Sequence, residues 1–144
     1  MMRKHTHATS SISASDLNPQ WKLVDAQGKV LGKVASEVSR YLQGKHKTNY
    51  VKNLESGDHV VVVNAAAVVI TGRKNIQKTY TSYSGYPGGL RKEVFESQFQ
   101  RKPTEVVRKA ISGMLPKNKL RDRRLARLHI YPDANHPYSN HFVS

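Results

Sequence analysis

The apolar positions along the chain change their period from one segment to the next, which predicts alternating strands and helices. Residues 21–26 combine aromatic and β-branched side chains and end at a glycine-containing turn, as short strands do. Between residues 31 and 42, apolar side chains recur every three or four positions, which predicts an amphipathic helix that ends at Gly44. Four consecutive valines within residues 59–64 favour a strand buried on both faces, as in a parallel sheet.

The second half of the chain continues this alternation. The apolar segment 68–71 is too short to assign, whereas residues 78–84 have strand propensity and residues 94–99 predict a helix. Pro103 is expected to open a further helix, since proline suits the first helical turn, and residues 128–131 predict a last short strand. The side chains that the helix after Pro103 is expected to bury are Val106, Val107, Ala110, Ile111 and Met114. Together these elements predict an α/β domain with a mostly parallel sheet.

Composition narrows the classes of function. The 144 residues include 24 lysine and arginine residues but 10 acidic ones, which gives a formal net charge of +14. A surplus of this size favours binding to a polyanion, above all nucleic acid, over the surface of an ordinary soluble enzyme. The absence of cysteine excludes disulfides, thiolate metal sites and cysteine nucleophiles. No apolar run approaches the roughly 20 residues that cross a bilayer, so no membrane partner is expected.

The most basic segment runs from Lys117 to Arg127 and contains a single acid, Asp122. On a helix its cations at i and i+4 would be neighbours and repel each other, whereas solvated helices usually alternate their charges. The segment is therefore predicted to bind phosphates, with a solvated helix face as the alternative. The residues assigned to this contact are Lys117, Asn118, Lys119, Arg121, Arg123, Arg124 and Arg127.

Three further basic loops are predicted to contact RNA, because they supply point charges and forked guanidinium groups that can follow an irregular phosphate backbone. Glycines between residues 85 and 89 would also allow close approach to another backbone, and Tyr86 among them is suited to stacking on an unpaired base. The alternative for Tyr86 is a surface turn in which the ring folds onto its own domain. The residues assigned to these contacts are Lys45, His46, Lys47, Arg73, Lys74, Gly85, Tyr86, Gly88, Gly89, Arg91 and Lys92.

Catalytic and metal-binding patterns find little support in the sequence. The segment from Gly28 to Lys33 is one residue short of a phosphate loop and is followed by Val34, in place of the serine or threonine that binds magnesium. There is no G-x-S-x-G elbow and no pair of carboxylates in apolar surroundings. No known metal-ligand spacing is matched by His5, His7, His129, His136 and His141. We therefore expect no enzymatic activity, no catalytic or metal-binding residue and no cofactor.

The first twenty residues differ in kind from the rest. Residues 1–20 are rich in serine, threonine and histidine and carry Arg3, Lys4 and one acid, Asp16. They lack the apolar stretch of a secretory signal. Their serine-rich, acid-poor character is similar to that of an organellar transit peptide, but two basic residues are few for such a peptide. We expect an N-terminal extension, flexible or threaded along RNA, followed by a single α/β domain in residues 21–144.

A set of short motifs follows one order along residues 21–137. The sharpest are Gly-Tyr-Pro-Gly-Gly-Leu from Gly85 and Gly-Met-Leu-Pro-Lys-Asn from Gly113. The others are Trp-Lys-Leu-Val-Asp-Ala from Trp21, Leu-Gly-Lys-Val-Ala-Ser from Leu31, Gly-Lys-His-Lys from Gly44, Gly57-Asp58, Val-Asn-Ala from Val63, and Thr71-Gly72. In these motifs the chain closely resembles the bacterial form of the universal large-subunit ribosomal protein thirteen family.

This resemblance implies a three-layer α/β/α fold around a four-stranded, mostly parallel sheet with basic loop extensions. It also implies a non-catalytic, structural constituent of the large ribosomal subunit, which binds large-subunit ribosomal RNA, lies near neighbouring ribosomal proteins and acts early in subunit assembly. A cytoplasmic bacterial ribosome is the expected location, with an organellar ribosome as the alternative. Residues 1–20 and the uncharged segment 65–67 depart from the family pattern, so no contacts are carried over to them.

Two other functions stay open on the sequence alone. The α/β layers would permit a nucleotide-dependent enzyme, because fold does not dictate function, although a competent phosphate loop is missing. A regulator that binds messenger RNA could coexist with the ribosomal role. Stabilisation by ATP, GTP or NAD would identify the enzyme, and mapped crosslinks on cellular RNA would identify the regulator.

Overall fold

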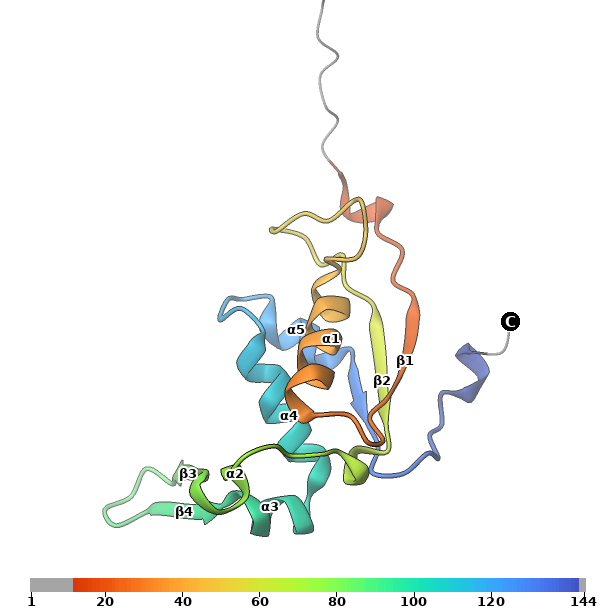
Figure 1. The fold of residues 1–144 in the computed structure, drawn as a ribbon. Helices are drawn as coiled ribbons and strands as arrows, with labels where there is room; N and C mark the ends of the chain where they lie inside the picture. Colours follow the sequence, from red (N-terminus) through yellow and green to blue (C-terminus); the bar gives the residue numbers. More distant parts are fainter. Residues whose placement is uncertain (1–11, 143–144) are drawn as a thin grey trace, which may run out of the picture.

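Three parallel strands form the central sheet of the computed structural model, which describes residues 12–142 (Figure 1). β1 (Trp21–Asp25), β2 (His59–Val63) and β5 (Leu128–Ile130) lie in the order β1-β2-β5. The central position of β2 follows from its sequence, because three of its valines are fully buried and such a run suits a strand covered on both faces. All three strands lie where the sequence predicts them.

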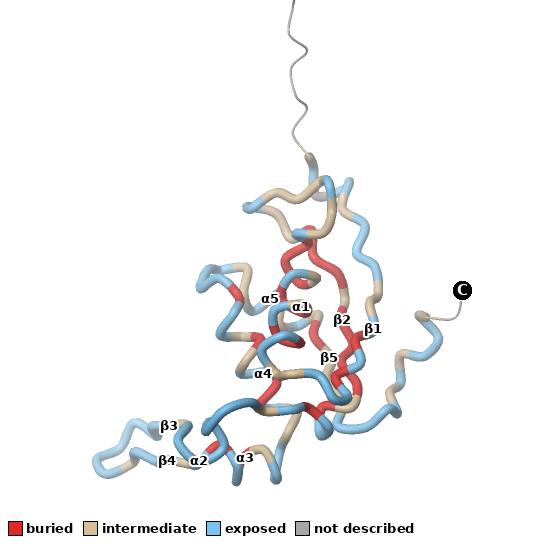
Figure 2. Tube along the Cα trace, in the orientation of Figure 1, coloured by how far each residue is buried: buried red, intermediate tan, exposed pale blue. Residues whose placement is uncertain are grey.

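One face of the sheet is covered by helices (Figure 1). α1 (Leu31–Gln43) and α4 (Pro103–Met114) pack against each other and against the strands, with α5 (Arg121–Ala126) beside them. Each of the two longer helices turns an apolar stripe toward the sheet, as its period predicts. The core lies at the centre of Figure 2 and includes Val24, Val34, Val38, Leu42, Val60, Val62, Val107, Ile111 and Leu128. Met114, which was expected in this core, is 45% exposed.

The opposite face of the sheet has no layer of helices of its own within residues 12–142. The second helical layer that the family resemblance implies is therefore not found there. Trp21 and its neighbours face the C-terminal segment, whose regular structure is one short turn, η3 (Ser139–His141). The Trp21 ring stacks on Tyr138 and His141 of this segment, at centroid distances of 4.9 and 4.3 Å. Aromatic and histidine rings thus cover part of this face in place of an amphipathic helix, and Leu23 beside them is 48% exposed.

The predicted four-stranded sheet contains three strands in the described part of the chain. The apolar segment at residues 68–71 makes a single parallel bridge, between Val69 and Val30. Pairing stops there because the chain turns at Gly72, whose φ is 74°. The α/β class and the parallel sheet are confirmed, whereas the strand number is lower than expected.

An antiparallel hairpin projects from the body (Figure 1). β3 (Thr79–Tyr83) pairs with β4 (Leu90–Val94), and α2 (Lys74–Gln77) and α3 (Phe95–Arg101) flank it. The sequence predicts the first strand but assigns Arg91 and Lys92 to a loop and Val94 to a helix, which is wrong. β4 is missing from the prediction because charged, exposed side chains interrupt it, so no apolar period marks it.

The loop between α1 and β2 depends on two close backbone approaches. Gly44 ends α1 with a φ of 75°, and its N–H donates to the Tyr41 carbonyl over 3.0 Å. A Cβ atom on Gly57 would overlap the carbonyl group of Leu42. The chain therefore needs glycine at both positions to bring the Lys45 loop back onto the end of α1.

Replacing Gly57 with alanine is expected to destabilise the fold by about 3 kcal/mol, because the backbone of α1 has to move to admit the added carbon. Thermal or denaturant unfolding of the purified chain measures the effect. Gly32→Ala is the matched control, since a Cβ there meets nothing within 4 Å and alanine favours the helix. Equal stability of the two variants would contradict the close approach.

Candidate nucleic-acid interface

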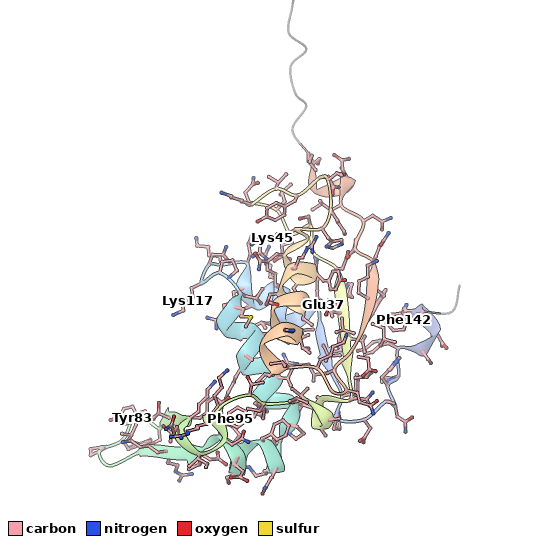
Figure 3. The ribbon with its side chains drawn as sticks, viewed as in Figure 1. Glu37, Lys45, Tyr83, Phe95, Lys117 and Phe142 are labelled. Carbon is pink, nitrogen blue, oxygen red and sulfur yellow. The ribbon has the colours of Figure 1, made fainter. Side chains whose placement is uncertain are left out.

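The exposed residues predicted to contact RNA lie on two parts of the molecule, together with exposed Lys52, Lys78 and Tyr83, which the sequence prediction did not include. One part, here called the loop surface, is formed by the exposed cations Lys45, Lys52, Lys117, Lys119 and Arg123. The other, here called the hairpin surface, is formed by Arg73, Lys74, Lys78, Tyr83, Tyr86, Arg91 and Lys92. Both lie away from the C-terminal segment in Figure 3, so the predicted contacts are not scattered around the whole molecule.

The loop surface joins two segments that are far apart in sequence. Residues 53–55, from the loop after α1, line a cavity together with Leu120, Arg123 and Arg127. Leu17 and Pro19 line the same cavity, so the chain that leads into β1 also reaches this region. Packing of α5 against the loop brings the two basic segments together, which no local sequence pattern could predict.

Three arginines of the basic segment turn inward and serve the fold. Arg124 is only 2% exposed. Arg127 donates from Nη1 to the Gly57 carbonyl over 2.7 Å, and Arg121 donates from Nη2 to the Ser112 hydroxyl over 2.5 Å. The helix within the segment begins only at Arg121, so Lys117 and Lys119 lie in the turn before it. The burial of Arg124 contradicts its assignment to RNA contact. The guanidinium groups of Arg121 and Arg127 already donate hydrogen bonds within the protein, and contact with RNA would need the same groups.

The exposed part of the basic segment is the turn before α5 together with Arg123 in the first turn of that helix. Lys117, Lys119 and Arg123 are exposed and form no ion pair with the described carboxylates. Asn118 shapes the turn, because its Oδ1 accepts a hydrogen bond from the Leu120 N–H at 3.2 Å. These three cations remain the strongest candidates for phosphate contact in this segment.

Asp58 anchors the loop that carries Lys45, His46 and Lys47. Its side chain is fully buried, with Lys47 Nζ at 2.5 Å from Oδ1 and His46 Nε2 at 2.8 Å from Oδ2. The Gln20 N–H also donates to Oδ1, over 2.9 Å. Two of the three predicted contact residues thus hold the loop in place, and Lys45 is the one that points freely into solvent.

The hairpin surface presents cations and aromatic rings together. Arg91 and Lys92 lie on β4, opposite Ser82 and Thr81, and are exposed. Tyr86 at the tip is 75% exposed, so the alternative of a ring folded onto its own domain is wrong. Gly85 and Gly88 take φ values of 88° and 74° there, which glycine adopts readily, and Gly89 is partly buried in the turn.

Few of the cations are neutralised within the molecule. Among residues 12–142, the lysine and arginine side chains that pair with a carboxylate are Lys47, Arg101, Lys102 and Arg127. The remaining exposed cations repel one another and raise the potential over both surfaces. A polyanion that covers these surfaces would remove this repulsion.

The histidines of the sheet surround Trp21 and are held neutral. His59 and His129 stack on the indole, at centroid distances of 4.5 and 5.7 Å, and His141 lies on it as well. Burial lowers the pKa of both His59 and His129. The nearby Arg127 lowers the pKa of His59 further, and Arg108 does the same for His129.

Stability is therefore expected to fall as the pH is lowered below about 6.5, because the unfolded chain then binds protons that folded His59 and His129 resist. The Asp58 carboxylate raises the pKa of His59 and so opposes the lowering, while His129 and His141 lower this pKa further. Unfolding midpoints measured between about pH 7 and pH 5 test this, and changing both histidines to glutamine should flatten the dependence. An unchanged slope in that variant would contradict the assignment.

Two further observations concern sites of other kinds. Within the described residues, no three histidine, aspartate or glutamate side chains are grouped so that they could hold a metal ion. His5 and His7 lie outside these residues, as does most of the predicted N-terminal extension. No helix among residues 12–142 has the length and apolar character needed to cross a membrane.

The sequence prediction did not include two lysines that the fold brings to the base of the hairpin. Lys78 Nζ lies 5.1 Å from the centre of the Tyr80 ring, and Lys109 Nζ, from α4, lies 4.4 Å from it. Lys109 is exposed on α4. Lys109 lies near Lys78 because α4 packs against α3 and Lys109 reaches the Tyr80 ring of the hairpin. No local sequence pattern predicts this packing.

The chain is similar to known proteins along most of its length. Residues 19–137 match the family model described as ribosomal protein L13. The chain is 44% identical over 132 residues to a protein of Dehalococcoides mccartyi named large ribosomal subunit protein uL13, a match that covers 92% of each chain. Proteins of the same name from Clostridioides difficile and Caldanaerobacter subterraneus are 45% and 46% identical, over 87% and 86% of this chain and 87% of each relative.

Proposed function

This chain belongs to the ribosomal protein L13 family, and from that membership we propose that it is a structural constituent of the large ribosomal subunit that binds large-subunit ribosomal RNA. It contacts the RNA through the loop surface and the hairpin surface. Its location is the bacterial cytoplasm, within the ribosome. The compact α/β body holds both surfaces at fixed positions, with residues 21–144 acting as one domain, which a single cluster of buried residues supports.

The observation that carries this proposal is the set of exposed cations without carboxylate partners on the two surfaces. Lysine and arginine side chains that bind phosphates release condensed counterions, and this release supplies much of the binding free energy. On the hairpin surface, Tyr83 and Tyr86 are 64% and 75% exposed and can stack on unpaired bases beside Arg91 and Lys92. The RNA is therefore held by charge on both surfaces and by stacking on one of them.

The work of the protein is to fix RNA segments against each other and not to catalyse a reaction. Two cationic surfaces on one rigid body can bind two segments of RNA at once and relieve the repulsion between their phosphates. This arrangement is useful early in subunit assembly, when RNA segments are first brought together, and neighbouring ribosomal proteins then pack around the same junction. Binding to messenger RNA is compatible with these surfaces, although no particular feature of them favours it.

Sedimentation of a cell lysate tests the proposal. We expect the chain to travel with large ribosomal subunits, at about one copy per particle, and to leave them at high salt as its phosphate contacts are screened. Quantitative mass spectrometry across the gradient measures this distribution. Recovery of the chain only at the top of the gradient, away from ribosomal particles, would contradict the proposal.

A further inference from the structure

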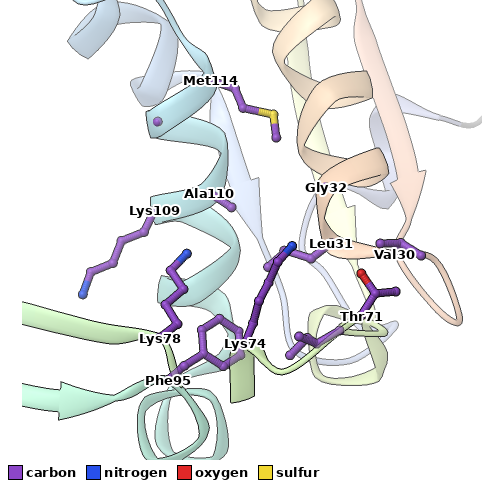
Figure 4. A pocket seen from close by; sticks show the side chains of 12 residues that line it. Val30, Leu31, Gly32, Thr71, Lys74, Lys78, Phe95, Lys109, Ala110 and Met114 are labelled. Carbon is purple, nitrogen blue, oxygen red and sulfur yellow. The ribbon is translucent and has the colours of Figure 1, made fainter. Parts of the chain in front are cut away.

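A cavity of about 380 Å³ opens between the start of α1, the base of the hairpin and α4 (Figure 4). Its apolar lining includes Leu31, Ile70, Phe95 and Met114. Met114 is 45% exposed at the side of this cavity, although it lies on a helix with a well-defined apolar stripe. A cavity of this size falls in the range that small organic ligands occupy, and its lining would accept a flat apolar body.

Three lysines, Lys74, Lys78 and Lys109, line the same cavity, and no acidic residue does. Figure 4 shows Lys74 and Lys78 reaching from the hairpin side toward α1 and α4. None of the three forms an ion pair with a described carboxylate, and the one hydrogen bond found for these ammonium groups runs from Lys109 to the Gln98 amide oxygen, over 3.2 Å. Like charges placed together without a counterion favour an anion as the missing partner.

From this combination, and resting on the proposed binding to ribosomal RNA, we propose that the cavity takes up one unstacked nucleotide of that RNA. The base lies against Leu31, Ile70 and Met114, and its phosphate pairs with Lys74 and Lys78. A nucleotide matches both halves of the lining, because it joins a flat, largely apolar body to an anion. A carboxylate side chain of a protein partner would satisfy the lysines but leave the apolar part unfilled.

The position of the cavity supports RNA over a free small molecule. Lys74 belongs both to the cavity and to the hairpin surface, and Arg73 precedes it in the chain. A strand that crosses Arg91, Lys92 and Tyr86 on the hairpin can therefore continue to the cavity mouth without leaving positively charged surface. Extrusion of a base is least costly where the nucleotide is already unpaired, so we expect the nucleotide to come from a loop, bulge or junction.

Gly113→Leu tests this proposal without changing any charge. Gly113 lines the cavity from α4, a Cβ there meets nothing within 4 Å, and leucine favours a helix more than glycine does, so the variant should fold. The leucine side chain would occupy space meant for the base. Ser97→Leu, on the exposed side of α3 and outside the cavity lining, is the matched control.

The readout is base-specific chemical probing of the RNA in large subunits from cells that carry each variant in place of the original chain. We expect one nucleotide, or two adjacent ones, to be protected by the original chain and by Ser97→Leu and to become reactive with Gly113→Leu. For an isolated RNA fragment that contains this nucleotide, affinity should fall by about tenfold with Gly113→Leu, with an unchanged salt dependence. Lys74→Gln should reduce the salt slope by about one, and Lys33→Gln, on the exposed side of α1, is its control.

Unchanged reactivity throughout the RNA in particles that contain Gly113→Leu would overturn the inference and leave the proposed function standing. If Gly113→Leu does not enter particles, the same probing with Lys74→Gln decides the matter by the same criterion. Failure of the proposed function has a separate signature, the absence of the original chain from large subunits.

Discussion

Replacing Lys117, Lys119 and Arg123 together with glutamine is expected to weaken binding to large-subunit RNA by about a hundredfold near 0.15 M salt. Each exposed cation that binds a phosphate releases close to one counterion, and three such losses combine to this factor. The same variant should lose about two to three units from the slope of log affinity against log salt. Equilibrium binding to an RNA fragment at several salt concentrations measures both quantities.

The fold should survive these three changes. All three side chains are exposed and make no ion pair with the described carboxylates, so the unfolding midpoint is expected to stay close to that of the original chain. The matched control removes three exposed cations from outside both surfaces, at Lys29, Lys33 and Lys102. If this control weakens RNA binding as much as the first variant does, the loop surface has no special role and only net charge matters.

Replacing Asp58 with alanine is expected to cost about 3 kcal/mol of folding free energy. The carboxylate is fully buried, and its removal leaves Lys47 without its counterion and the Gln20 N–H without its acceptor. Lys47 keeps one hydrogen bond, to the Asn18 carbonyl at 2.9 Å, and it retains some exposure, which limits the loss. Denaturant unfolding at neutral pH measures the change.

Asp58→Asn separates charge from hydrogen bonding at the same position. The amide oxygen can still accept from the Gln20 N–H, so the expected loss is about half that of alanine. Both variants should also weaken RNA binding, because the loop that carries Lys45 is no longer tied to the body. Stability of Asp58→Ala within about 0.5 kcal/mol of the original chain would contradict the role assigned to this carboxylate.

The sequence predicts the central elements well because their periods are strong and uninterrupted. The valines of β2 and the three- and four-residue spacing in α1 each favour one structure only, and Gly44 and Pro103 mark helix ends through their own backbone geometry. β4 carries no such period, because its charged side chains face solvent and its pairing with β3 is what makes it a strand. Within residues 12–142 no fourth strand joins the sheet, for a related reason, since Val69 pairs at one point before the chain turns away.

The candidate site could be predicted in its charge but not in its geometry. Composition and the run from Lys117 to Arg127 indicate a partner with many phosphates, and family membership agrees with that partner. Which cations are available is decided by tertiary contacts: Arg124 is buried and His46 lies against Asp58. The cavity with its three lysines carries no signal in the sequence either, because Lys109 of α4 reaches the Tyr80 ring beside Lys78 only through the tertiary fold.

The central claim is that the surplus of positive charge on the two surfaces is neutralised by ribosomal RNA. The most direct test is the affinity of the original chain for large-subunit RNA between about 50 and 200 mM salt. If six or more phosphates are bound, log affinity should fall against log salt with a slope of about −5 or steeper, which is a loss of about a thousandfold over this range. An affinity that barely changes with salt would show that these cations do not bind the RNA backbone, and the account would fail.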